Sequence, residues 1–316
     1  MKKLTKFISP ILLVLAAMIW GFAFTAQKVA DTLPALTIGA VRSLFATVFL
    51  IFVVMLFDKI LKPGRRLFSR EKKIDLTRTE IIGGIACGAA LSIASFFQQF
   101  GINAGTDAGK SSFITALYVV LVPIYALALK KKAPLNVWLS MPIAVVGFYL
   151  LCITKQLTIE SSDLIVCICA LLFPVHILVI DHFSPRCDGI RMSLVQFATA
   201  TVINLILALI FEPPIDFGLI GSCIFPLLFL GIGSSGIAYT LQILGQRGTN
   251  PAAASILMSL ESVFGIVGSA IFLSEKMTGR EYAGCAVVFI AVILSQLDFD
   301  AIFKNKKGKQ RQTAVK

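Results

Sequence analysis

Ten long apolar segments, separated by short stretches rich in Gly, Pro, Asn and charge, constrain the fold more than any other feature. About 20 helical residues cross the hydrocarbon core of a bilayer. Because lipid offers the backbone no hydrogen-bond partners, such segments cross as helices. The approximate segments are 8–28, 35–57, 79–102, 107–129, 134–154, 162–180, 189–211, 218–244, 251–273 and 279–297. We therefore expect an all-α integral membrane protein with ten transmembrane helices.

The composition agrees with a membrane protein and leaves no room for a separate soluble domain. Hydrophobic residues make up 57% of the 316 residues and charged residues only 15%, whereas soluble domains carry about 25% charged residues. Ten spans and short loops account for nearly the whole chain.

Basic residues set the expected orientation. With the amino terminus inside, most of the 29 Lys and Arg residues fall in cytoplasmic stretches, namely 2–6, 59–78, 130–132, 186–191, Arg247 and 304–316. This bias predicts a multi-pass protein of the plasma (inner) membrane with both termini cytoplasmic. It also accounts for the net charge of +12 through topology and contact with anionic lipid, so we expect no nucleic-acid partner.

One stretch returns in the same order 143 residues later. Residues 99–106 read QFGINAGT and residues 242–249 read QILGQRGT, and each crosses a short Gly-containing loop between two apolar runs. The register holds beyond the loop, because Leu117 then falls on Leu260. A membrane chain that repeats itself is typical of secondary transporters.

Each half holds five spans, and an odd number turns the second half over relative to the first. The halves are residues 1–155 and 156–298, followed by a basic tail at 299–316. The first helices match more weakly, with Arg42 near Gln196. We expect two inverted five-helix repeats and a binding site near the bilayer midplane between them.

Two charged side chains are expected deep in the membrane. Glu261 lies ten residues into the segment 251–273, about 15 Å deep at 1.5 Å per residue. A charge at a helix centre costs roughly 2.5–3.5 kcal/mol on insertion scales. Two interpretations remain open for Glu261, a proton- or cation-sensitive substrate contact and a structural hydrogen bond. Arg42 could bind a substrate carboxylate or phosphate, pin its helix to another, or extend to the surface.

Further candidates for the binding site are aromatic, amide and imidazole side chains within the spans. Trp20, Tyr118 and Tyr239 could stack on a substrate or simply pack. Gln98 and Gln99 lie near the end of the segment 79–102, and Gln242 lies near the end of the corresponding segment 218–244. We take Gln99 and Gln242 as candidates to line the cavity. His176 follows Pro174, where it could relay protons or be a hydrogen-bonded histidine between helices.

No pattern in the sequence indicates a cofactor or an enzyme. The seven Cys are scattered through the spans without clustered His, so we expect neither a metal nor a disulfide framework. No spacing assembles a nucleophile with a base, and no nucleotide-binding motif suggests ATP drive.

Several stretches carry a resemblance to a known family. The stretches are residues 18–24 (MIWGFAF) with Lys28, residues 40–42 (AVR), residues 109–123 (GKSSFITALYVVLVP), and residues 260–264 (LESVF) followed by Ser274-Glu275-Lys276. In their order and spacing they resemble the drug/metabolite transporter superfamily, and within it the EamA-type ten-helix permeases. Ser262 stands where the family usually has Pro, and Ser274 where it usually has Gly.

The resemblance implies a permease that moves a small metabolite, such as an amino acid or a related compound, by alternating access. It favours export and leaves import open, and a gradient of protons or another cation is a candidate driving force. The alternative from another class is a membrane receptor or scaffold without a transport cycle, which the duplicated halves and buried charges disfavour. The oligomeric state stays open, a homodimer included.

Overall fold

The computed structural model describes residues 2–60, 76–131, 133–152, 160–247, 249–272 and 278–297. Within these ranges the chain is helical and contains no strand. The helices of the first half are α1 (Lys2–Val29), α2 (Ala35–Ile60), α3 (Arg78–Asn103), α4 (Ala108–Ala116), α5 (Tyr118–Ala128) and α6 (Leu135–Cys152). Those of the second half are α7 (Ser161–Phe183), η1 (Ser184–Arg186), α8 (Gly189–Phe211), α9 (Phe217–Ser222), α10 (Ile224–Leu228), η2 (Phe229–Ala238), α11 (Tyr239–Gln246), α12 (Pro251–Met258), α13 (Glu261–Phe272) and α14 (Gly279–Gln296).

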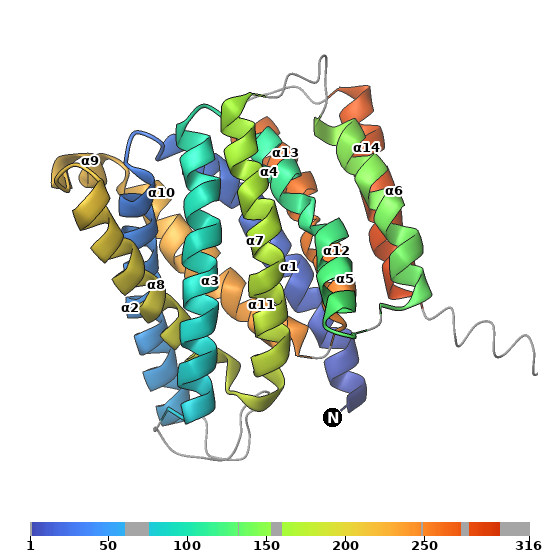
Figure 1. Ribbon diagram of the computed structural model, residues 1–316, viewed down its shortest axis with the longest axis horizontal. Helices are drawn as coiled ribbons and strands as arrows, with labels where there is room; N and C mark the ends of the chain where they lie inside the picture. Colours follow the sequence, from blue (N-terminus) through green and yellow to red (C-terminus); the bar gives the residue numbers. More distant parts are fainter. Residues whose placement is uncertain are drawn as a thin grey trace, which may run out of the picture.

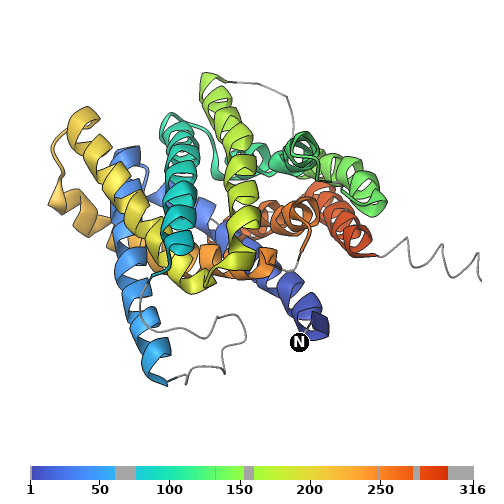
Figure 2. The same ribbon diagram turned by 60° about the horizontal axis from the view of Figure 1, so that its bottom comes forward.

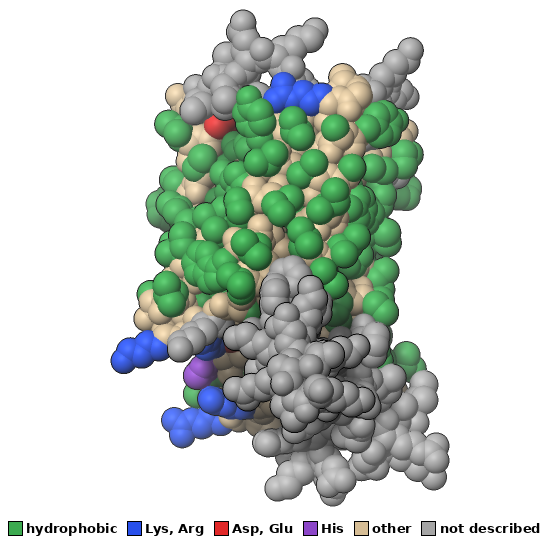
Figure 3. Space-filling model, turned by 90° about the vertical axis from the view of Figure 1, so that its right-hand side faces the viewer, with side chains coloured by type: hydrophobic (Ala, Val, Ile, Leu, Met, Phe, Trp, Pro, Cys, Tyr) green, Lys and Arg blue, Asp and Glu red, His purple; other side chains and the backbone are tan. Residues whose placement is uncertain are grey.

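The expected spans are found as helices in the described part of the chain. Nine helical stretches there are long and apolar enough to cross a membrane, and the expected fifth span appears as the shorter apolar helix Leu135–Leu151. Large apolar side chains point outward along them, including Phe52, Phe211 and Phe225. Figure 3 shows the resulting hydrophobic belt on one face, with Lys and Arg side chains near both ends. Such a belt is suited to contact lipid rather than water.

The helix contacts repeat when the two halves are exchanged. α3 of the first half packs against α7 and α8 of the second. The counterpart of α3 is η2 with α11, and it packs against α1 and α2, the counterparts of α7 and α8. The pairs α2–α8 and α6–α14 map onto themselves, and Figures 1 and 2 place these two pairs at opposite edges of the bundle. The connection from α3 to α4 lies at the top of Figure 1, and that from α11 to α12 lies in the lower half. The fold is therefore two repeats of opposite topology.

Two expected continuous spans are interrupted at matching positions. α4 gives way to α5 at Leu117, whose backbone N–H donates to Ile114 O at 3.2 Å. α12 gives way to α13 at Ser259 and Leu260, and the Leu260 N–H donates to Leu257 O at 3.3 Å. These two bonds are 143 residues apart at both ends, so the interruption belongs to the repeat. Tyr118 and Glu261 are the first residues of the helices that follow.

The helix expected at 218–244 departs most from its counterpart α3. It is divided into α9, α10, the π-helix η2 and α11. A π-turn closes i→i+5 hydrogen bonds instead of i→i+4, so one extra residue is accommodated.

Glycine contacts show the resulting change of register. Before the end of η2, Gly88 and Gly231 make equivalent close approaches to Gln196 O and Arg42 O. After it, Gly101 packs on Ser162 O and Val166, while Gly245 packs on Ser9 O and Leu13. The offset between the two members of each glycine pair therefore increases from 143 to 144 residues.

Candidate functional site

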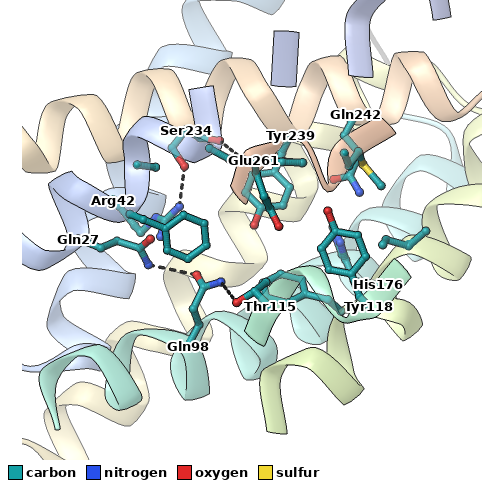
Figure 4. Close-up of a pocket in the computed structure, with 16 residues that line it drawn as sticks. Gln27, Arg42, Gln98, Thr115, Tyr118, His176, Ser234, Tyr239, Gln242 and Glu261 are labelled. Carbon is teal, nitrogen blue, oxygen red and sulfur yellow. Dashed lines mark hydrogen bonds between the residues drawn. The ribbon is translucent and has the colours of Figure 1, made fainter. Parts of the chain in front are cut away.

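A narrow cavity lies between the two repeats near the middle of the bundle. It is lined by Trp20, Ala23, Phe24, Gln27, Arg42, Gln98, Thr115, Tyr118, Phe173, His176, Ile177, Ser234, Tyr239, Gln242, Met258 and Glu261. Figure 4 shows Arg42 and Gln27 toward one end, Tyr118, His176 and Gln242 toward the other, and Glu261 between them. Both halves of the chain therefore contribute polar side chains to one enclosed space.

The lining follows the symmetry of the repeats. Tyr118 and Glu261 occupy matching positions at the two helix interruptions, as do Thr115 and Met258. Gly245 approaches Ser9 O as Gly101 approaches Ser162 O, so Ser9 of α1 corresponds to Ser162 of α7. At the same offset, Trp20 corresponds to Phe173 and Ala23 to His176. The cavity thus straddles the pseudo-two-fold axis, where an inverted-repeat transporter places its site.

Most of the candidate residues from the sequence meet in this cavity, and one does not. Trp20, Arg42, Tyr118, His176, Tyr239, Gln242 and Glu261 line it, whereas Gln99 does not. Gln99 points to a different contact, donating from Nε2 to Asn103 Oδ1 at 2.8 Å. Its neighbour Gln98 lines the cavity instead, because the extra residue of η2 makes Gln98 the structural counterpart of Gln242.

Arg42 is buried and bound to the π-helix. Its Nε donates to Ser235 Oγ and its Nη2 donates to Ser234 Oγ, both at 3.0 Å. Within the described ranges no ion pair joins Arg42 to a carboxylate. A guanidinium has five N–H donors, so these two bonds leave donors for a ligand. The side chain pins α2 to η2, and it does not reach the bundle surface, since only 8% of it is exposed.

Glu261 is the buried acidic group of the cavity. It is 5% exposed and makes no ion pair within the described part of the chain. Tyr118 lies beside it in the wall. Neither the Tyr118 hydroxyl nor Glu261 Oε1 has a hydrogen-bond partner there. A buried charge without a partner is costly, so this site favours either a neutral acid or a cationic ligand.

Aromatic rings form one wall beside these charges. The Trp20 and Tyr239 ring centroids are 4.7 Å apart with planes tilted by 57°, and Trp20 Nε1 donates to Ser234 O at 3.2 Å. His176 lies edge-on to Tyr239 at 5.7 Å, and its Nε2 is 3.1 Å from Gln196 Oε1. The rings are fixed by packing and hydrogen bonds before any ligand binds.

Four buried polar atoms around the cavity lack a partner in the described protein. They are Tyr118 Oη, His176 Nδ1, Gln242 Oε1 and Glu261 Oε1. Buried polar atoms are nearly always hydrogen-bonded. Their convergence on one space fits a cavity built to hold a polar ligand or water.

Sequence reasoning missed several polar side chains of the site. Thr115 lies within the stretch 109–123 that carries the family resemblance, and Gln27 lies between residues 18–24 and Lys28. Ser234 and Ser235 lie in a Gly-rich apolar run. Their common signal is a polar residue within a span, which is weak for Ser, Thr and Gln. Lys28 and Lys110 lie outside the cavity and pair with Asp31 and Asp163 respectively. Ser274-Glu275-Lys276 and the tail at 299–316 lie outside the described residues.

The chain is similar to a protein-family model, to a curated protein and to solved structures. The model of the EamA-like transporter family matches residues 7–153 and again residues 160–297. A protein described as "Uncharacterized transporter" from Archaeoglobus fulgidus is 27% identical over 287 residues, covering 90% of this chain and 84% of that protein. A solved structure described as "Crystal structure of protein" has a TM-score of 0.72 at 15% identity, covering 91% of this chain and 96% of that chain, and so shares the fold.

Proposed function

The chain belongs to the EamA-like transporter family, and we propose that it carries a small zwitterionic metabolite, such as an amino acid, across the membrane by alternating access. It is a multi-pass membrane protein whose partners are the bilayer and a small molecule.

One observation carries the substrate class. Arg42 and Glu261 line the same enclosed cavity and form no ion pair with each other or with any other described side chain. A carboxylate on the substrate would complement the guanidinium, which binds carboxylates through paired N–H groups. An ammonium group would complement Glu261 and the faces of Trp20 and Tyr239. A zwitterion offsets both buried charges at once, whereas a simple acid or amine offsets only one.

The helix interruptions support alternating access. Non-helical backbone is tolerated at membrane depth where it lines a cavity, and broken helices at the midplane surround transporter sites. Leu117 and Leu260 mark such breaks, and the neighbouring residues Thr115, Tyr118, Met258 and Glu261 line the cavity. We propose that the halves 1–155 and 156–298 rock about this site, with the breaks absorbing the change in helix direction.

Glu261 is our candidate for coupling to protons or another cation. The charged or titratable side chains that share the cavity with it are Arg42, Tyr118, His176 and Tyr239. A carboxylate that exchanges a proton when the cavity closes removes a buried charge at that moment. We place the protein in the plasma membrane with both termini cytoplasmic, following the distribution of basic residues, and we favour export.

Flux measurements test this proposal. The purified protein is reconstituted into proteoliposomes, which are loaded with each of a panel of radiolabelled amino acids. Saturable flux is expected for at least one of these amino acids. Arg42→Gln should reduce flux of that substrate at least about tenfold at unchanged abundance, and Arg42→Lys should also reduce it because the planar fork is lost. Arg186→Gln, at an exposed position, is the matched control. Absence of saturable flux across the panel would contradict the proposal and favour a receptor or scaffold.

A further inference from the structure

We propose that the two sides of the cavity are closed by gates of different chemistry, a hydrogen-bonded gate in the first repeat and an apolar gate in the second. The hydrogen-bonded gate is formed by Gln27, Gln98 and Thr115. The apolar gate is formed by the matching residues of the second repeat, which are Ile180, Gln242 and Met258. The inference deepens the proposed alternating access and rests on it. It assigns to these residues a positioning role, which sets the side from which the ligand-free cavity opens.

The hydrogen-bonded gate joins three helices. Gln27 Nε2 donates to Gln98 Oε1 at 3.1 Å, and Gln98 Nε2 donates to Thr115 Oγ1 at 3.0 Å. Figure 4 shows this chain running along the edge of the cavity from α1 through α3 to α4. All three side chains are buried. Gln27 lies near the end of α1, Gln98 in the last two turns of α3, and Thr115 at the end of α4, just before the helix break. The ends of α1 and α3 lie on the side of the bundle opposite the amino terminus.

A second layer supports the gate on the same side. Gln99 Nε2 lies 3.4 Å from Gln27 O and donates to Asn103 Oδ1 at 2.8 Å. Asn103 Nδ2 in turn donates to Leu33 O at 2.7 Å. These bonds tie α3 to the end of α1 and to the turn that follows it. The closed arrangement on this side is therefore held by hydrogen bonds in two layers.

The repeat symmetry identifies the residues of the opposite gate. The helix breaks match Thr115 with Met258. The glycine contacts that follow the π-helix match Gln98 with Gln242, and the contacts of Ser162 and Ser9 match Ile180 with Gln27. Ile180 packs with Ile243, just as Gln27 lies against Gln99, the counterpart of Ile243. The correspondence therefore holds for the neighbours as well as for the gate.

The consequence appears at Gln242. Its counterpart Gln98 has Gln27 and Thr115 as hydrogen-bond partners. The positions that match these two partners in the second repeat hold the buried apolar side chains of Ile180 and Met258. Gln242 Oε1 is accordingly buried without a partner in the described structure. The duplicated glutamine closes the cavity in one repeat and presents an unused amide oxygen to it in the other.

The two gates should open at different cost. When the hydrogen-bonded gate opens, its amides and hydroxyl exchange protein partners for water, so the net loss is small. When the apolar gate opens, Ile180 and Met258 must be exposed to water, which costs free energy in proportion to their area. The ligand-free protein should therefore open mainly on the side of the hydrogen-bonded gate, opposite the amino terminus.

Thiol labelling measures which side opens. Ala23→Cys places a small reporter in the cavity wall, where Ala23 is buried. A charged, membrane-impermeant methanethiosulfonate reagent is applied to vesicles of each orientation. The unsubstituted chain measures the background from its own cysteines. The reporter should react about tenfold faster from the side opposite the amino terminus. Equal rates from both sides, or faster reaction from the amino-terminal side, would overturn the proposal.

Exchanging the gates provides the matched test. Gln27→Ile with Thr115→Met copies the apolar gate into the first repeat and should slow labelling from the side opposite the amino terminus. Ile180→Gln with Met258→Thr should speed labelling from the amino-terminal side. Should the double substitution at Ile180 and Met258 fail to fold, Met258→Thr alone should still speed it. If the well-folded variants keep the wild-type labelling pattern, the gates do not differ as proposed.

The failures of the two proposals look different. Labelling requires no transported substrate. If only the gate assignment is wrong, flux is intact and the gate-exchange variants keep the wild-type labelling rates. A transporter assignment that is wrong gives no flux for any compound, together with a reporter that is labelled from one side only under every condition.

Discussion

At the scale of single residues, the cavity brings together a base and an acid that do not neutralise each other. Arg42 is bound to two serines of η2, and Glu261 has an oxygen without a partner within the described chain. The sequence predicted both as membrane-embedded charges, because their cost in lipid makes them conspicuous. The serine partners of Arg42 were not predictable, because a short hydroxyl side chain within an apolar run gives little signal.

Replacing Glu261 by Gln tests whether its ionisation couples transport to protons. The amide keeps the shape and hydrogen bonding of the acid but cannot exchange a proton. We expect Glu261→Gln to reach wild-type abundance, to lose most of the pH dependence of flux, and to transport more slowly. Flux should be measured in proteoliposomes across a series of pH values, with Glu160→Gln, at an exposed position, as the control.

A different result would identify a structural role for Glu261. In that case Glu261→Gln would transport with the wild-type pH profile, whereas Glu261→Ala would lower abundance by leaving a small void beside Tyr118. Unchanged pH dependence in well-expressed Glu261→Gln would therefore remove the coupling role.

At the scale of elements, the repeat was predictable from sequence and its distortions were not. The pairing of Leu117 with Leu260 followed from the duplicated loop. That both residues interrupt a helix did not follow, because neither break carries Gly or Pro and tertiary packing decides it. The π-helix η2 likewise displaced the expected match of Gln99 with Gln242 by one residue, which is why Gln98 lines the cavity.

Close helix packing at Gly101 and Gly245 gives a prediction about stability. A Cβ atom at Gly101 would lie 2.4 Å from Val166 Cγ2, and one at Gly245 would lie 2.8 Å from Leu13 Cγ. We expect Gly101→Ala and Gly245→Ala each to destabilise the fold by about 1–3 kcal/mol, as overpacking does. Thermal denaturation in detergent measures this. Gly221→Ala, which meets nothing within 4 Å, should not lower the midpoint, and equal midpoints for all three variants would contradict the packing described.

At the scale of the whole molecule, residues of both halves line one cavity, and the distribution of basic residues predicts which side of it faces the cytoplasm. The hydrophobic belt and the approximate number of spans followed from the spacing of apolar segments. The duplicated architecture followed from the repeated loop sequence. The enclosed shape of the cavity did not, because it depends on which side chains meet across the axis between the repeats.

Reporter fusions test the orientation of the whole molecule. A reporter fused after Lys316 should be cytoplasmic, and one inserted between Glu212 and Phe217 should be external. The insertion spares Glu212 itself, whose carboxylate accepts from Leu36 N at 2.6 Å and Thr37 N at 2.8 Å. An external signal from the tail fusion would reverse the orientation and the assignment of the gates to the two faces of the membrane.

Competition for flux tests whether Arg42 and Glu261 together select a zwitterion. Saturable flux of a transported amino acid should be inhibited by other amino acids. Analogues that lack only the amino group, or only the carboxylate, should compete at least about tenfold more weakly, because each leaves one buried charge uncompensated. If the deaminated or the decarboxylated analogue competes as well as the parent amino acid, the paired recognition described here is contradicted.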